Sequence, residues 1–299
     1  MILSHVDEDH VNCLKILLAK LAAEKITVGV LMLPCLNTAE KLMAKAHANH
    51  RGPSTVIMNI TGDDRDTVEY LAQLGVEAVE FLRSDDSTEP PPDLRSAVNP
   101  AGTTIHASFV ASGTDLTASS LIPWKLVAMR LEPPQGTIAA FTTALKASTG
   151  LDPDDPTKHH ELLTQYRPEL SAAMTVAASE VGFAGYGNSL TNWSCISIFG
   201  SSPTPVTSHS APVGTAGDFS MDCDHGWLHT GDLPPDITDV WQTFKRVWEP
   251  HLGSASLCAL TALHHGSPNG HNPSLYATFE APQVFCRSYA GCDSRLRVA

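Results

Sequence analysis

The first side chains that could do chemistry stand near the start of the chain, in the segment Ser4-His5-Val6-Asp7-Glu8-Asp9-His10. On an extended or turning backbone the side chains of His5, Asp7 and Asp9 project to similar sides, and His10 swings round to join them. Imidazole nitrogen and carboxylate oxygen are the ligands that zinc and similar divalent ions use when they activate water. We therefore predict a metal site here, in preference to an acidic turn that only caps the following helix.

Two later segments carry similar side chains at the predicted ends of strands. Asp232 closes the segment Leu-His-Thr-Gly-Asp over residues 228–232, and His264 and His265 stand before Gly266 in ALTALHHGS, residues 259–267. A lone Gly-Asp turn or a lone histidine pair is ordinary at a protein surface. Three such segments, each at a predicted strand end, indicate one metal centre assembled from distant parts of the chain.

These three segments together resemble the metallo-β-lactamase superfamily. They are similar to the branch that contains the hydrolase domain of competence-type DNA-uptake proteins, where the patterns SHxDxDH, TGD and HHGS recur in this order. Residues 192–198 (NWSCISI) look like the Asn-x-Ser strand of that branch, and the resemblance covers residues 1–272. It implies an αββα sandwich in the α/β class, incomplete in its first sheet because only Met1-Ile2-Leu3 precedes the first motif, as in an N-terminally truncated member.

The resemblance also implies a ligand set for two divalent ions. His5 and Asp7 would bind one ion, Asp9 and His10 the other, and Asp232 would bridge them. A histidine of the 264–265 pair would complete the second site; His265 is favoured because it directly precedes the glycine, but both stay candidates. Zinc is the first expectation, with manganese as the alternative, because Asp7 replaces a usual histidine and makes the site richer in oxygen.

The implied reaction is two-metal hydrolysis, in which an activated water attacks a phosphoryl or carbonyl centre. Asp9 is the predicted catalytic residue, because its carboxylate would orient that water and accept its proton. The superfamily's intermediate histidine ligand is not placed by the motifs. Three histidines are candidates for it, and each is expected at the surface instead: His106, His159 and His160.

Alternating helices and strands must position these residues. The first eighty residues read as helices over 10–25, 38–50 and 66–74, with strands over 26–33, 54–60 and 76–82. Later strands are predicted over 124–131, 193–199, 227–229, 257–263 and 283–289, and helices over 137–148, 161–179 (interrupted at Pro168) and 241–248. The acidic, proline-rich residues 84–100 and the Ser/Pro/Thr/Gly-rich residues 201–217 read as exposed insertions. No repeat or shift in composition marks a boundary, so we predict a single domain over 1–299.

The bulk composition restricts partners and location. The net charge of -13, from 32 Asp+Glu against 19 Lys+Arg, opposes tight non-specific binding to duplex nucleic acid, although bound metal ions would supply local positive charge. No apolar run reaches the roughly 18 residues of a membrane span, so no membrane partner is expected. No signal peptide is visible, and the 7 cysteines are scattered without CxxC spacing, which predicts reduced thiols and a cytoplasmic location.

The resulting prediction is a metal-dependent hydrolase that acts on phosphodiester bonds, either a nuclease or a phosphodiesterase. Its substrate would be a small molecule or a nucleic acid. The alternative is a truncated or degenerate, non-catalytic member that acts as a binding protein; a lactamase or thioester hydrolase on the same fold is a third interpretation. An incomplete sheet would leave an edge exposed, so a homo-oligomer formed through that edge is also predicted.

Overall fold

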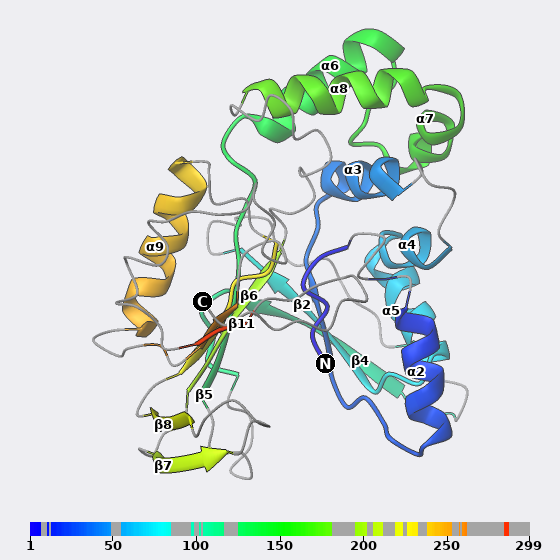
Figure 1. The fold of residues 1–299 in the computed structure, drawn as a ribbon. Helices are drawn as coiled ribbons and strands as arrows, with labels where there is room; N and C mark the ends of the chain where they lie inside the picture. The colour runs from blue at the N-terminus through cyan, green and yellow to red at the C-terminus, as the bar shows by residue number, and fades with distance from the viewer. Residues whose placement is uncertain are drawn as a thin grey trace. The chain divides into compact units, whose positions relative to one another are not determined.

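The computed structural model shows a mixed α/β protein, which confirms the predicted class (Figure 1). It describes residues 1–6, 11, 13–48, 55–84, 97–98, 102, 104–116, 125–180, 195–201, 206–211, 219–223, 226–232, 238–252, 257, 259–261 and 284–286. The chain divides into two compact units. Unit 1 comprises Met1–Ala111 and Arg130–Ile196, and unit 2 comprises Ser112–Met129 and Ser197–Ala299.

Unit 1 is built on a four-stranded sheet with the order β1-β2-β4-β3. The strands β1 (Leu31–Pro34), β2 (Ala78–Arg83) and β4 (Thr104–Ala111) are parallel, and β3 (Ala97–Val98) pairs antiparallel with β4. The start of the chain extends this sheet, because Ile2 forms a parallel bridge with Met32 and the Leu3 N–H donates to the Met32 carbonyl at 3.0 Å. Residues 1–3 therefore cover the edge of β1.

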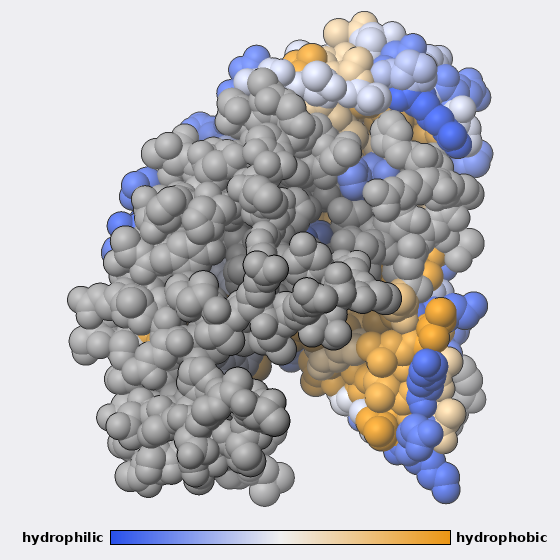
Figure 2. Space-filling model, in the orientation of Figure 1, coloured by the Kyte–Doolittle hydropathy of each residue, from blue (hydrophilic) through white to orange (hydrophobic). Residues whose placement is uncertain are grey.

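Three helices pack on the sheet of unit 1 around one apolar core. They are α2 (Leu14–Ala23), α4 (Thr55–Ile60) and α5 (Asp64–Gln73), which lie along the same side of the sheet in Figure 1. Leu14 and Leu18 of α2 are buried one turn apart, as an apolar stripe requires, and they join Ile57, Leu71 and Val79 in this core. The outer face of α2 and the segment after it are also apolar (Figure 2), with exposed residues Ile16, Leu17, Ile26 and Val30.

The strand predicted over residues 54–60 is wrong, because residues 55–60 form the helix α4. A short apolar run fits a buried strand and a buried helix equally well, and tertiary contacts decide between them. Ile57 and Ile60 are buried three residues apart, which is helical spacing, and the Thr61 hydroxyl donates to the Ile57 carbonyl at 2.6 Å. The Thr67 hydroxyl of α5 lies 3.1 Å from the Ile60 carbonyl, so the two helices close into a hairpin.

The other helices of unit 1 follow the predicted pattern closely. The helix α3 (Thr38–Ala48) lies within the predicted 38–50, and α6 (Thr137–Thr149) ends at Gly150, whose φ of 73° favours glycine. The predicted helix over 161–179 is two helices, α7 (His159–Gln165) and α8 (Arg167–Glu180), after a short 3-10 turn at Pro156–Lys158. Helices α6 and α8 lie side by side, and α3 packs against α6, α7 and α8 (Figure 1).

Unit 2 centres on a five-stranded sheet with the order β11-β10-β9-β6-β5. Strand β9 (Trp227–His229) is parallel to β10 (Ala259–Thr261), which is parallel to β11 (Val284–Cys286), while β6 (Ile196–Ser201) is antiparallel to β9. The fifth strand is β5 (Lys125–Arg130). Helix α9 (Thr238–Leu252) buries Trp248, whose ring lies 6.2 Å from that of Phe199 of β6.

Two regions expected to be irregular contain strands. Residues 206–211 of the predicted excursion form β7 (Val206–Ala211), which pairs antiparallel with β8 (Phe219–Cys223). Within residues 84–100, Ala97–Val98 form β3. Strand β4 had no sequence prediction at all. It is half-exposed along its length, and its polar residues hide the period of a buried strand.

Candidate metal centre

His5 stands at the carboxyl end of the N-terminal segment that pairs with β1. Its side chain is 1% exposed, between the core residues Leu3 and Val6. The Ser4 hydroxyl lies 3.2 Å from His5 Nδ1, and the Ser4 carbonyl accepts a hydrogen bond of 2.6 Å from the Ile196 N–H. The backbone before the imidazole is thus fixed on both sides, by β1 and by the last residue of unit 1.

The rest of the first motif lies outside the described residues: Asp7, Glu8, Asp9 and His10. Val11 is described, and the chain is described continuously from Cys13, with α2 beginning at Leu14. The described part therefore gives a segment bridged to β1 at Ile2, a buried histidine three residues later, and a helix from Leu14.

Asp232 follows β9 in unit 2 and is 6% exposed. The residues before it are held by hydrogen bonds across the sheet. The Thr230 N–H donates to Thr261 Oγ1 at 3.1 Å, the Thr230 hydroxyl donates to the Thr261 carbonyl at 3.2 Å, and the Ser197 hydroxyl donates to the Thr230 carbonyl at 3.1 Å. Gly231 has a φ of 65°, where a side chain would be strained. A rigid turn therefore carries the Asp232 carboxylate.

His229 belongs to this turn, although the sequence did not single it out. Its Nδ1 accepts a hydrogen bond of 3.0 Å from the Gly231 N–H, so in the neutral ring the proton is on Nε2. The signal in the sequence was its place two residues before the glycine of the Thr-Gly-Asp motif. We assign His229 a positioning role, because it fixes the left-handed glycine that precedes Asp232.

The third motif begins just beyond the described part of β10. His264 and His265 lie outside the described residues, three and four positions after Thr261. Because β9 and β10 are parallel, their carboxyl ends share one edge of the sheet. The chain therefore leaves Thr261 from a point next to Thr230, to which Thr261 is hydrogen-bonded.

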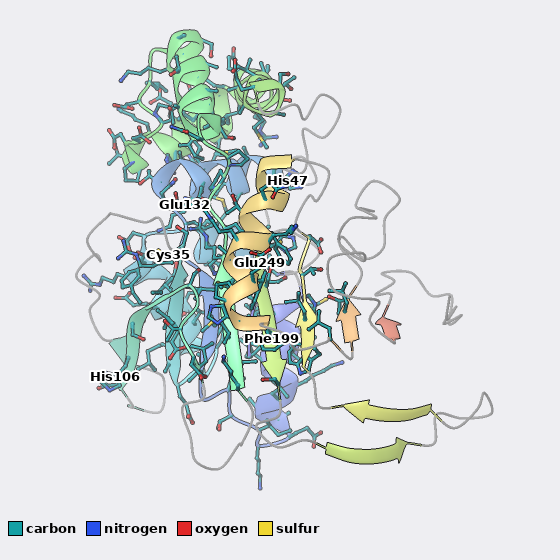
Figure 3. All side chains as sticks on the ribbon, turned by 90° about the vertical axis from the view of Figure 1, so that its left-hand side faces the viewer. Cys35, His47, His106, Glu132, Phe199 and Glu249 are labelled. Carbon is teal, nitrogen blue, oxygen red and sulfur yellow. The ribbon has the colours of Figure 1, made fainter. Side chains whose placement is uncertain are left out.

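The three candidates for an intermediate histidine fall in different surroundings. His106 is exposed on β4, where it pairs in register with Ala78 at the amino end of β2, and its position on the ribbon is marked in Figure 3. His106 therefore lies near the amino ends of the parallel strands β2 and β4. His160 is exposed, as expected, but His159 is 4% exposed, so the expectation of a surface position is wrong for it.

A second polar group lies at the carboxyl ends of β1 and β2 in unit 1. Arg130 and Glu40 form a buried ion pair with 2.5 Å between Nη2 and Oε1, and the Ser84 hydroxyl donates to Glu132. Cys35 follows β1 in the same region, and Figure 3 marks Cys35 and Glu132. Burial raises the pKa of the Cys35 thiol to about 11, against the opposing effect of Arg130. The thiol is therefore protonated at neutral pH and is a poor nucleophile.

Comparison with protein-family models, with curated proteins and with solved structures finds no match to this chain. Within the described ranges, no three His, Cys, Asp or Glu side chains are arranged to hold a metal ion. Of the seven predicted ligands those ranges contain His5, in unit 1, and Asp232, in unit 2. No helix in the described part of the chain is long and apolar enough to span a membrane.

Proposed function

We propose that this chain is a metal-dependent hydrolase of phosphodiester bonds with a metallo-β-lactamase-like sandwich fold. One observation carries the proposal: His5 and Asp232, the two predicted ligands within the described residues, are both buried, His5 three residues after the β-bridge of Ile2 and Asp232 three residues after the end of β9. Burial of an imidazole or a carboxylate is unfavourable unless the group has partners, so buried residues of these types are more informative than exposed ones. Their donor atoms, imidazole nitrogen and carboxylate oxygen, suit zinc or manganese.

In this proposal His5, Asp7, Asp9, His10, Asp232 and either His264 or His265 would hold two divalent ions. Such ions would supply Lewis acidity, which lowers the pKa of water and polarises phosphoryl oxygens. The Asp9 carboxylate would accept the proton of the attacking water. Hydrogen bonds of the Thr230 and Gly231 N–H groups fix the backbone that leads to Asp232, so little reorganisation of that backbone would be needed when the site is loaded.

The substrate we favour is a small or short phosphodiester. The net charge of -13 opposes the approach of long polyanions, whereas a diester with a single charge is repelled much less. A cytoplasmic location belongs to the same proposal; it is supported by the described cysteines Cys13, Cys35 and Cys195, which are not in disulfides. A homo-oligomer formed through a sheet edge stays a prediction.

The decisive experiment is the metal content of the purified full chain, measured by elemental analysis after dialysis. We expect about two equivalents of zinc or manganese per chain, and loss of at least about one of them in Asp232→Ala. The matched control is Asp154→Ala, which removes an exposed carboxylate of unit 1 and should leave the metal content unchanged. A wild-type chain without stoichiometric metal would reject the hydrolase and favour the non-catalytic binding protein.

Substrate class is then tested with the metal-loaded chain. We expect turnover of bis-p-nitrophenyl phosphate, and a loss of at least about a hundredfold in kcat for Asp9→Asn, which removes a proposed metal ligand together with the proton acceptor. Turnover of a β-lactam or a thioester without turnover of the diester would contradict the phosphodiester assignment and support the third interpretation of the sequence.

A further inference from the structure

Helices α3 and α7 are in contact within unit 1, and both carry basic side chains. Lys41 and Lys45 are four residues apart on α3, so they share one face of that helix. His159 is the first residue of α7. None of these three residues is among the seven predicted metal ligands, and we call them the basic cluster.

His159 is the most buried member of the basic cluster, with 4% of its surface exposed. Its Nε2 donates to the Pro153 carbonyl at 3.0 Å, whereas its Nδ1 is buried and has no hydrogen-bond partner in the described part of the chain. Burial lowers the pKa of His159, and the ammonium groups of Lys45 and Lys41 act in the same direction, against the Pro153 carbonyl and Asp155. A buried nitrogen left without a partner is rare in folded proteins and calls for an explanation.

Lys45 is half-buried, and within the described residues its ammonium group makes no hydrogen bond or ion pair. Burial lowers its pKa to about 8, with a further contribution from Lys41. Lys41 has its own counterion, because its Nζ lies 2.6 Å from Asp64 Oδ1. The basic cluster therefore contains a partly desolvated cation, Lys45, that has no acidic group beside it within the described ranges, and a desolvated imidazole, His159. A bound anion would stabilise the charged forms of both groups.

We propose that Lys45 and His159 bind a small tetrahedral oxyanion of the sulfate or phosphate kind, with Lys41 adding to the positive field. The Lys45 ammonium donates to one oxygen, and protonated Nδ1 of His159 donates to another, which gives the unpartnered nitrogen its hydrogen bond. Partial burial of Lys45 limits the ligand to a small ion. Binding takes up protons, because the anion favours the charged forms of both groups.

The test is calorimetric titration of the full chain with sulfate, whose charge stays constant across the pH range used. We expect saturable binding that tightens as the pH falls from about 8.5 to about 6.5, and that weakens at least about tenfold in Lys45→Met. The control is Lys20→Met, which removes an exposed lysine of α2 and should bind sulfate as the wild type does. All titrations are repeated in the Asp232→Ala background, so that sulfate held by metal ions is not counted.

A second measurement follows the Lys45 amine itself, by competitive labelling and peptide mass spectrometry. Saturating sulfate should raise the apparent pKa of Lys45 by about one unit or more and leave that of Lys20 unchanged. Lys45→Met removes a desolvated charge, so it should fold; Lys45→Arg should keep most of the affinity. Absence of saturable binding, equal binding by Lys45→Met, or a labelling profile insensitive to sulfate would each overturn the proposal. None of these outcomes depends on whether the chain binds metal.

Discussion

Glu40 joins two parts of unit 1 through its two carboxylate oxygens. One oxygen, Oε1, pairs with Arg130 Nη2 at 2.5 Å, and the other, Oε2, accepts a hydrogen bond of 2.8 Å from the Asn37 N–H. In the other direction, the Glu40 N–H donates a hydrogen bond of 2.9 Å to Asn37 Oδ1. The two residues therefore form a reciprocal cap at the start of α3. The end of β5 and the start of α3 therefore depend on a single buried carboxylate.

Replacement of Arg130 by Met should leave that carboxylate buried without its cation. We expect the free energy of unfolding at neutral pH to fall by about 3–5 kcal/mol, measured by urea denaturation. The matched control is Arg65→Met, which breaks the exposed pair with Glu69 and should change the free energy by less than about 1 kcal/mol. Equal losses in the two variants would contradict a special role for the buried pair.

The same variant should show a distinctive pH dependence. Burial raises the pKa of Glu40 above its model-peptide value of 4.5, and the Arg130 guanidinium opposes that rise. Without Arg130 the pKa of Glu40 in the folded state rises further, so the folded state binds a proton more readily than the unfolded state. The stability of Arg130→Met is then highest below pH 4.5 relative to wild type and is lost as the pH rises through the folded-state pKa. A deficit that did not shrink between about pH 8 and about pH 5 would contradict this account.

At the scale of elements, periodic apolar patterns predicted most of the helices. The main error is the strand predicted over residues 54–60, a segment too short to distinguish a strand from a helix. The helices α3, α5, α6 and α9 each repeat apolar residues at helical spacing and end near a glycine, a proline or a turn, which is visible in the sequence. Residues 55–60 are too few to show a period, so only their packing with α5 identifies them as a helix.

The sequence predicted which residues could bind a metal ion at the candidate site, but it did not predict the hydrogen bonds that position them. The motifs indicated His5 and Asp232, and both are buried, Asp232 shortly after the end of β9. His229 is hydrogen-bonded to the Gly231 N–H, and Thr261 to the Thr230 N–H, in the structure in which β9 and β10 are paired. A local sequence pattern therefore does not predict the roles of His229 and Thr261. Whether the motifs assemble into one centre stays a prediction, because most of their residues lie outside the described ranges.

Thr67 of α5 allows a test of what stabilises α4, the helix that the sequence analysis predicted as a strand. The Thr67 hydroxyl is fully buried and lies 3.0–3.1 Å from the carbonyls of Asn59, Ile60 and Asp63. The isosteric change Thr67→Val removes the donor and should lower the free energy of unfolding by about 1–3 kcal/mol in urea denaturation. Thr164→Val is the control, since it removes an exposed hydroxyl within α7, and it should change stability by less than about 0.5 kcal/mol. A neutral Thr67→Val would mean that apolar packing alone maintains the hairpin.

At the scale of the whole molecule, the chain passes between the two units at points that the composition does not mark. The crossings fall at the end of β4, within β5 and within β6, that is, in or beside regular strands and not in flexible linkers. A sequence search for linkers therefore finds no boundary, and the single domain predicted over 1–299 stays a prediction. Of the predicted ligands within the described ranges, His5 belongs to unit 1 and Asp232 to unit 2.

Net charge is the other property of the whole molecule that bears on function. With a charge of -13, the protein should repel an oligonucleotide at long range, in contrast to nucleases with a basic surface. Screening weakens that repulsion as salt is added, since the Debye length falls from about 10 Å at 0.1 M to about 3 Å at 1 M.

If the chain hydrolyses phosphodiesters, raising NaCl from about 0.05 M to about 0.3 M should increase kcat/KM for a 20-nucleotide substrate by about twofold or more. The matched substrate is bis-p-nitrophenyl phosphate, whose single charge should make kcat/KM nearly independent of salt. A rate on the oligonucleotide that fell with salt would show that the substrate meets a basic surface, and it would favour nucleic acid over small diesters as the natural substrate.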